Sequence, residues 1–138
     1  MTAFVLDASI ALSWCFQDEA TPETWALLEL LAMQSASVPA LWPLEVGNIL
    51  AAAEQRTRLT AGRSAEFLAL IEGLDIVIDT DTAARAFHDT LALARAEALT
   101  TYDASYLELA MRMGVPLATR DRQLRQAAER LGVVVLGQ

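Results

Sequence analysis

Short apolar runs alternate along the chain with longer segments in which apolar residues recur every three or four positions. Apolar runs without polar alternation are typical of strands buried on both faces of a parallel sheet. The spacing of three to four residues is typical of helices that pack one face on a core. Because strands and helices that alternate connect through right-handed crossovers, the pattern predicts an α/β fold with a mainly parallel sheet of four to five strands and helices on both sides.

Strands are expected at residues 4–6, 37–41, 75–79, 115–119 and 133–136, the second shortened or placed at an edge by its proline. Helices are expected at residues 8–16, 21–34, from 42, 60–74, 80–96, from 103 to Gly114, and from Asp121 to Gly132. The helical spacing turns Trp25 and Phe87 toward the core, and residues 99–103 form a short turn or strand. Since no repeat or linker interrupts the pattern, one domain covering residues 1–138 is expected.

The composition indicates a folded chain in a reducing compartment. Hydrophobic residues make up 54% of the 138 residues and charged residues 20%, which excludes disorder and hints at an apolar surface for a partner. The single cysteine, Cys15, has no partner for a disulfide, so we read it as a packing residue of a cytoplasmic protein. We expect no signal peptide and no contact with a membrane, since no apolar run reaches membrane-spanning length.

The charged residues exclude several function classes. A formal net charge of −8 argues against a protein that coats nucleic acid through general basicity. All ten basic side chains are arginines, so a Walker phosphate loop, which needs a lysine, is excluded. A phosphoaspartate receiver with Asp7 as its nucleophile is disfavoured on the same ground.

Three acids lie at junctions between strands and helices. Asp7 ends the first strand, Asp103 precedes a helix after an extended segment, and Asp121 lies between a strand and a helix. Carboxyl ends of parallel strands meet at one edge of a sheet, where ligands collect. Asp7 is also compatible with a simpler role, capping the next helix.

Glu45 is the fourth candidate acid. It lies beside an apolar helical stripe that begins at Trp42, and a carboxylate there needs a partner or a metal to offset its lost solvation. Asn48, three residues later, lies on the same flank and has an amide that can orient Glu45 or supply a neutral oxygen. Clustered carboxylates repel, and Mg²⁺ or Mn²⁺ is the expected remedy because hard cations prefer oxygen ligands. One ion, or two about 4 Å apart, can activate water for phosphodiester hydrolysis.

Four sequence blocks surround these acids, at residues 5–9, 43–50, 101–110 and 118–124. In order and spacing they resemble the motif blocks of PIN-domain proteins, and most closely those of the VapC toxins of type II toxin–antitoxin (VapBC) modules. The resemblance covers nearly the whole chain.

The resemblance implies a three-layer α/β/α sandwich and a toxin that acts as a metal-dependent endoribonuclease, a hydrolase of RNA phosphodiester bonds that inhibits translation or growth. It assigns Asp7, Glu45, Asp103 and Asp121 as catalytic residues and ligands of Mg²⁺ or Mn²⁺. Supporting roles fall to Asn48, Thr119 and Ser9. It further implies a homodimer and a VapB-like antitoxin whose C-terminal segment covers the acidic groove, in a heterotetramer or larger complex.

Substrate contacts must come from the arginines. Arg120 and Arg122 flank Asp121 and can reach RNA phosphates, or they are simply solvated. Residues 56–63 hold a second, less favoured basic cluster, and the three tryptophans are more consistent with packing than with base stacking. His88, the only histidine, is expected at the surface. The alternative to a ribonuclease is a catalytically silent PIN-like module that binds a partner protein.

Overall fold

The computed structural model describes residues 2–138 and is built around a five-stranded sheet in which every neighbouring pair of strands is parallel. The strands lie in the order β3-β2-β1-β4-β5, so β1 is central. Their bounds are β1 Thr2–Leu6, β2 Ser35–Val38, β3 Ile76–Ile78, β4 Leu117–Ala118 and β5 Val135–Leu136. The predicted parallel sheet is therefore confirmed, with the second strand starting two residues earlier than expected so that Pro39 follows it.

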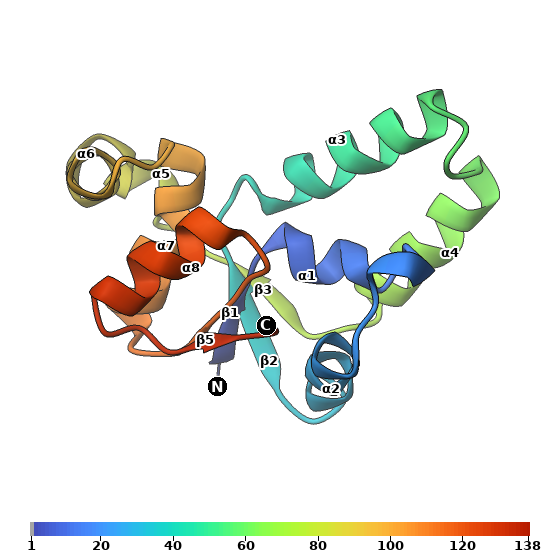
Figure 1. The fold of residues 1–138 in the computed structure, drawn as a ribbon, viewed down its shortest axis with the longest axis horizontal. Helices are drawn as coiled ribbons and strands as arrows, with labels where there is room; N and C mark the ends of the chain where they lie inside the picture. Colours follow the sequence, from blue (N-terminus) through green and yellow to red (C-terminus); the bar gives the residue numbers. More distant parts are fainter. Residues whose placement is uncertain (1) are drawn as a thin grey trace.

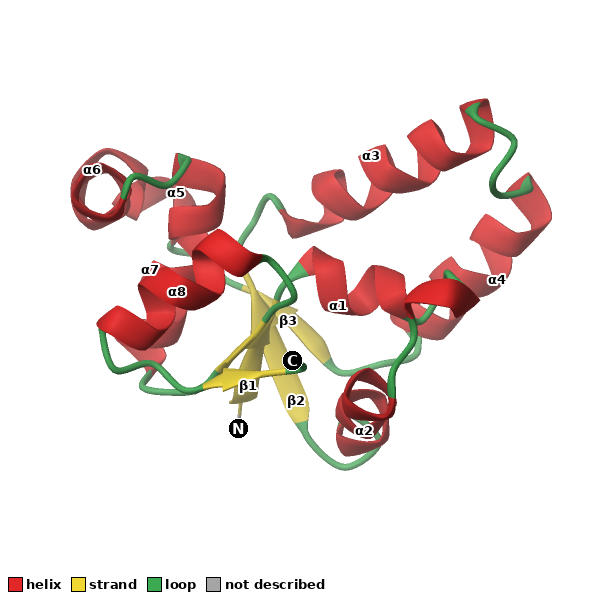
Figure 2. Cartoon of the chain, viewed as in Figure 1, coloured by secondary structure: helices red, strands yellow, loops and turns green. Residues whose placement is uncertain are grey.

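Helices cover both faces of the sheet, which confirms the predicted layers. Figures 1 and 2 show α1 to α4 on one side of the strands and α5 to α8 on the other. Their bounds are α1 Ala8–Ser13, α2 Pro22–Leu30, α3 Trp42–Gln55, α4 Ala61–Glu72, α5 Thr82–Arg85, α6 Leu91–Glu97, α7 Thr101–Met113 and α8 Arg122–Arg130. None of the helices in residues 2–138 combines the length and hydrophobicity needed to cross a membrane.

The central strand explains why the chemistry gathers where it does. Phe4, Val5 and Leu6 are completely buried, as expected for a strand covered on both faces. From β1 the chain crosses to β2 on one side, whereas β4, on the other side of β1, leads outward to β5. In open α/β sheets, ligands bind at the carboxyl ends of the strands where the direction of winding reverses. Asp7 and Thr119 directly follow β1 and β4 at this reversal.

The long helix predicted at residues 80–96 is interrupted. It divides into α5, a π-helical turn at Ala86–Thr90 and α6, with non-helical angles at His88 (φ −117°, ψ −108°). The break turns Phe87 outward, and its side chain is 84% exposed rather than packed on the core. His88 is exposed, as predicted.

In the helix that starts at residue 22, the predicted position of Trp25 toward the core is wrong. Thr24 is completely buried because its hydroxyl and that of Thr21 form a capping box, and its carbonyl accepts a hydrogen bond of 2.8 Å from the Trp14 indole. These polar contacts bring the face of Thr24 and Leu27 inward. Trp25 is consequently 44% exposed.

A largely buried ion network connects the end of β3 to α7. The guanidinium of Arg112 donates two hydrogen bonds to Asp79, of 3.0 and 2.7 Å, and two to Glu108, of 2.8 and 3.0 Å. The side chains of Asp79 and Glu108 are only 10% and 8% exposed. Burial raises the pKa of Asp79, but hydrogen bonds from Arg112, Thr82 and the Asp81 N–H outweigh it and lower the pKa below its usual value. The network fixes α7, the helix that carries Asp103.

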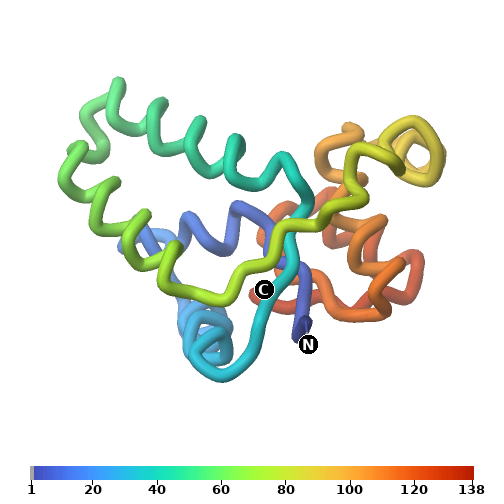
Figure 3. Tube along the Cα trace, turned by 180° about the vertical axis from the view of Figure 1, so that it is seen from behind, coloured from blue at the N-terminus to red at the C-terminus, as the bar shows by residue number. Residues whose placement is uncertain are grey.

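The edge strand β3 is open on one side of the molecule. In the view from behind in Figure 3, the chain at β3 crosses in front of β2, and no helix covers β3 on this side. Val77 and Ile78 are each 48% exposed, which leaves an apolar strip on the free edge.

Candidate functional site

Asp7 lies at the end of the central strand with its carboxylate held by two hydroxyl groups. The side chain is 7% exposed, and Oδ2 accepts hydrogen bonds from Ser9 (2.8 Å) and Thr119 (2.7 Å). The backbone carbonyl of Asp7 accepts the first helical bond, from the Ile10 N–H at 3.1 Å, whereas its side chain makes no capping hydrogen bond. The simpler interpretation, that the carboxylate caps α1, is therefore not what the structure shows.

The two hydroxyl groups also connect Asp7 to the segment after β4. Ser9 Oγ accepts a hydrogen bond from the Arg120 N–H, and Thr119 Oγ1 accepts one from the Asp121 N–H, both at 3.0 Å. The Asp7 N–H in turn donates to the carbonyl of Ala118. Ser9 and Thr119 thus lie beside Asp7, and they fix the relative positions of Asp7 and Asp121.

Asp121 and Asp103 occupy the starts of two helices. Asp121 is the N-cap of α8, and its Oδ1 accepts a hydrogen bond of 2.9 Å from the Leu124 N–H. Asp103 lies in the first turn of α7, which begins two residues earlier than Asp103 because the Thr100 hydroxyl caps it by accepting from the Asp103 N–H at 3.0 Å. The short turn or strand expected at residues 99–103 is therefore wrong from Thr101 onward, and Asp103 is half-buried, with a side-chain hydrogen bond from Thr100 that lowers its pKa.

Glu45 reaches the same region from the first turn of α3. Its Oε1 accepts a hydrogen bond from the hydroxyl of Tyr106, a completely buried residue of α7. Asn48 is exposed and makes no hydrogen bond to any acid of the site within residues 2–138. No contact therefore supports the predicted role of Asn48 in orienting Glu45, and the Tyr106 hydroxyl contacts Glu45 instead.

The pKa values of Asp7, Glu45 and Asp103 are each raised in part by the charge of neighbouring acids. Burial raises the pKa of Asp7, and the charge of Asp121 raises it further against the lowering effect of the two hydroxyl groups. Burial, Asp121 and Asp7 together raise the pKa of Asp103 to about 6. Burial, Asp7 and Asp103 raise the pKa of Glu45 against the lowering effect of the Tyr106 hydrogen bond. Among the described residues 2–138, no ion pair to any of the four acids is found, so the site concentrates unpaired negative charge.

The protein without bound metal is expected to lose stability as the pH rises through about 6. A carboxyl group whose pKa is higher in the folded than in the unfolded state binds its proton more tightly when folded. For Asp103 this stabilisation is complete below the unfolded value of about 3.9 and is lost as the pH passes its folded value of about 6. Melting temperatures measured in EDTA from pH 4 to 8 should fall less steeply for Asp103→Asn than for the parent. Parallel profiles would contradict the assignment.

The donor set suits a hard divalent cation, although no metal cage is preformed. Carboxylates and hydroxyl groups are the oxygen ligands that Mg²⁺ and Mn²⁺ prefer, and the raised pKa values show a charge that a cation would neutralise. Within residues 2–138, however, no three His, Cys, Asp or Glu side chains come close enough to hold a metal ion by themselves. The acids thus form a shared electrostatic site rather than a closed set of ligands.

The two arginines beside Asp121 differ in whether their side chains are held by other residues. The Arg120 guanidinium donates to the carbonyl of Glu19 in a 3₁₀ turn (Gln17–Glu19), which anchors it across the molecule. Arg122, the first residue of α8, is exposed, and no ion pair to it is found within residues 2–138. In the second basic cluster, Arg58 is paired with Asp18 and Glu19 and lies 4.0 Å over the Phe16 ring.

The aromatic and sulfur-containing side chains mostly pack in the core. Trp14 and Trp42 are buried, as the packing interpretation predicted, and so is Cys15. Sequence reasoning missed two features, the Tyr106 hydroxyl and the Arg112 network. A signal for Tyr106 was present, since it follows Asp103 by three residues and so shares its side of a helix.

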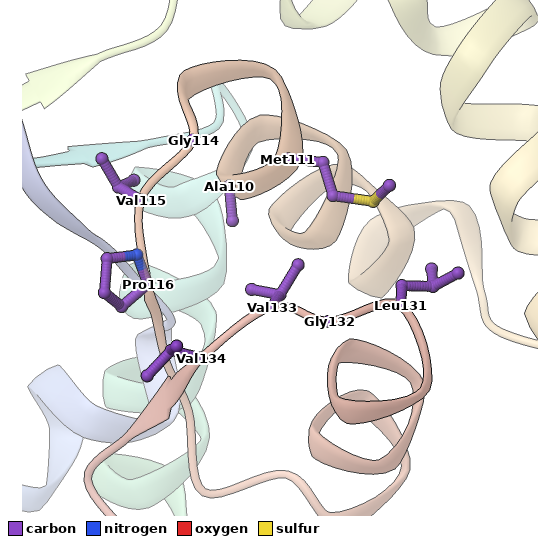
Figure 4. A pocket seen from close by; sticks show the side chains of 9 residues that line it. All are labelled: Ala110, Met111, Gly114, Val115, Pro116, Leu131, Gly132, Val133 and Val134. Atoms are coloured by element: carbon purple, nitrogen blue, oxygen red, sulfur yellow. The ribbon is translucent and has the colours of Figure 1, made fainter.

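One apolar pocket lies away from the acids. It has a volume of about 370 Å³ and is lined by residues at the end of α7 and around the starts of β4 and β5. Figure 4 shows its side chains, which include Met111, Val115, Pro116, Leu131 and Val133. No titratable group lines it, so it is not the candidate site.

Comparison with known proteins agrees with this architecture. The family model for the PIN domain matches residues 4–130. The chain belongs to the PIN-domain family. PIN domains are generally nucleases and typically depend on metal, so the acids of this PIN domain lie in a fold associated with nuclease activity.

Two solved structures show the same fold. PAE2754 from Pyrobaculum aerophilum has a TM-score of 0.72 and 21% identity, over 97% of this chain and 83% of that one. FitAcB from Neisseria gonorrhoeae has a TM-score of 0.62 and 20% identity, over 97% of this chain and 96% of that one. The comparison with curated protein sequences gives no match. At this identity the two structures establish the fold of this PIN domain.

Proposed function

We propose that this PIN domain, spanning residues 1–138, is the toxin of a type II toxin–antitoxin module of the VapBC kind and a metal-dependent endoribonuclease. The observation that carries the proposal is that Asp7, Glu45 and Asp103, from separate elements, each have a pKa raised in part by the charge of neighbouring acids, Asp121 among them. Structural roles such as the helix cap made by Asp121 do not account for the clustering of acids, because accumulated buried charge destabilises the chain unless a cation or a substrate offsets it.

The proposed roles of the site residues are metal binding and the positioning of the metal-binding carboxylates. Asp7, Asp103, Glu45 and Asp121 would hold Mg²⁺ or Mn²⁺, with water completing the ligand set. When bound, such an ion activates water and stabilises the leaving oxygen of a phosphodiester. Ser9 and Thr119 hold one oxygen of Asp7 by their hydroxyl groups and so would fix the carboxylate for metal binding.

RNA must approach an acidic protein, and local arginines would guide it. Arg122 is exposed next to Asp121, on the first residue of α8, which makes it the better candidate for a phosphate contact. Arg120 is held by Glu19 and would contribute from a fixed position. Single strands and loops of RNA are the proposed substrates because their backbone is accessible.

The proposed partners are a second copy of the chain and a VapB-like antitoxin. The exposed apolar strip at Val77 and Ile78 supports association with another chain, and the acidic site offers the charge that a basic antitoxin segment would cover. A homodimer that binds antitoxins in a heterotetramer or larger assembly, in the cytoplasm, is consistent with these features.

Cleavage of single-stranded RNA is the experiment that tests the proposed function. The purified chain should cut a fluorescent RNA in millimolar Mg²⁺ or Mn²⁺ and stop on addition of EDTA, with activity restored by excess metal. A heat-inactivated sample controls for contaminating nuclease.

A silent PIN-like module that binds a partner remains the second candidate, and the lack of a preformed metal cage within residues 2–138 favours it. Titration with Mn²⁺ separates the two functions. Binding accompanied by RNA cleavage supports the ribonuclease, whereas no heat of binding at millimolar Mn²⁺ and no cleavage would support the silent module.

A further inference from the structure

Tyr106 is a fixed hydrogen-bond donor underneath the candidate site. Its side chain is completely buried and belongs to the hydrophobic core, and interiors pack too tightly for such a ring to move freely. The hydroxyl nevertheless points to a carboxylate, Oε1 of Glu45. A phenylalanine would pack the same space, so core packing alone does not account for the hydroxyl.

Glu45 depends on this contact for its position. Within residues 2–138, the Tyr106 hydroxyl is the one group found to donate a hydrogen bond to the Glu45 carboxylate. Two neighbours on α3, Leu44 and Asn48, do not pack around the Glu45 side chain to hold it, since Leu44 is 78% exposed and Asn48 is exposed. A glutamate has several rotatable bonds and loses much rotamer freedom when it is ordered. A rigid donor that holds one oxygen restricts this freedom before any ligand arrives.

The arrangement also links Glu45 to the other acids. Tyr106 follows Asp103 by three residues on α7, so the two side chains lie on the same side of the helix. The helix α7 therefore carries Asp103 itself and also holds Glu45 in place through the Tyr106 hydroxyl. The helices α3 and α7 belong to opposite layers of the fold (Figure 1). The hydrogen bond from Tyr106 to Glu45 therefore connects the helix that carries Glu45 with the helix that carries Asp103.

We infer that Tyr106 is a positioning residue that orients Glu45 toward a divalent cation, an inference that rests on the proposed metal-dependent function. The phenol holds Oε1 and directs Oε2 to the site shared with Asp7 and Asp103. Groups that orient metal ligands typically contribute 10-fold to 100-fold to metal affinity.

The test compares Tyr106→Phe with the parent by calorimetric titration of the metal-free protein with MnCl₂ at pH 8, which lies above the pKa of about 6 of Asp103. We expect about 10-fold weaker Mn²⁺ binding. The matched control is Tyr102→Phe, which makes the same change at the other tyrosine of the chain, four residues away on the same helix and 65% exposed. Its affinity should equal that of the parent.

A second background separates positioning from a general structural effect. If Tyr106 acts through Glu45, adding Tyr106→Phe to a Glu45→Ala variant should change Mn²⁺ affinity less than about 2-fold. In RNA cleavage, the Tyr106→Phe variant should need about 10-fold more Mn²⁺ for half-maximal rate, with most of the maximal rate recovered at saturating metal.

The outcomes are distinct. A parent that binds no Mn²⁺ overturns the proposed function and this inference together. A parent that binds Mn²⁺ while Tyr106→Phe binds it equally well overturns the inference alone. It is also overturned if Tyr106→Phe does not fold, as judged by circular dichroism, or if its effect persists undiminished in the Glu45→Ala background, because both results assign the hydroxyl a structural role.

Discussion

Replacing Asp7 with asparagine is expected to lower metal-dependent RNA cleavage by at least about 100-fold while the fold stays intact. Asparagine has nearly the shape of aspartate, and its amide oxygen can still accept hydrogen bonds from Ser9 and Thr119. The change removes the charge that a cation would need, and metal ions contribute several kcal/mol to stabilising such a transition state. Asp103→Asn should have the same effect from the α7 side.

The melting temperature distinguishes loss of chemistry from loss of structure. Burial raises the pKa of Asp7, so the neutral amide should leave the metal-free protein as stable as the parent or slightly more stable at pH 7. Asp75→Asn is the matched control, because Asp75 is an exposed acid next to β3 and away from the site. It should cleave RNA and arrest growth like the parent. If Asp7→Asn cleaves RNA at the parental rate, the assignment of the four acids is wrong.

Replacing Arg112 with alanine is expected to destabilise the protein by about 3–5 kcal/mol, the usual cost of removing one partner from a buried ion pair. The substitution leaves Asp79 and Glu108, which are almost fully buried, without their shared cation. For a chain of this size the melting temperature should fall by roughly 10 °C or more. Without Arg112 the pKa of Asp79 would also rise. The lowered pKa now stabilises the fold at neutral pH, and this stabilisation is lost as the pH falls through that pKa. The variant would lack this contribution.

Arg63→Ala is the control for this prediction. Arg63 forms an ion pair with Glu66 on the same helix, but both side chains are more than half exposed. Exposed pairs of this kind contribute only about 0.5 kcal/mol, so thermal unfolding of Arg63→Ala should be close to that of the parent. Equal melting temperatures for the two variants would show that the Arg112 network is not a principal support of α7.

The positions of the helices and strands were largely predictable because periodicity depends on local spacing. The buried run at residues 4–6 and the start of a helix near residue 21 appear in the structure as predicted. The helix predicted at residues 80–96 was not, since nothing in its spacing reveals the break at His88. The outward position of Trp25 depends on hydrogen bonds made by Thr24, including one from Trp14, and residues that far apart in sequence leave no periodic signal.

The sequence by itself determined the alternation of elements, the parallel sheet and four candidate acids, three at junctions of strands and helices and one beside an apolar helical stripe, because each of these follows from residue type and spacing. Only the tertiary structure decided what each acid contacts. It left the Asp7 carboxylate free of the helix cap, used Asp121 as a cap, left Asn48 in solvent and placed the Tyr106 hydroxyl against Glu45. These contacts join residues as many as 112 positions apart, and such pairings arise from the order of strands in the sheet rather than from any local pattern.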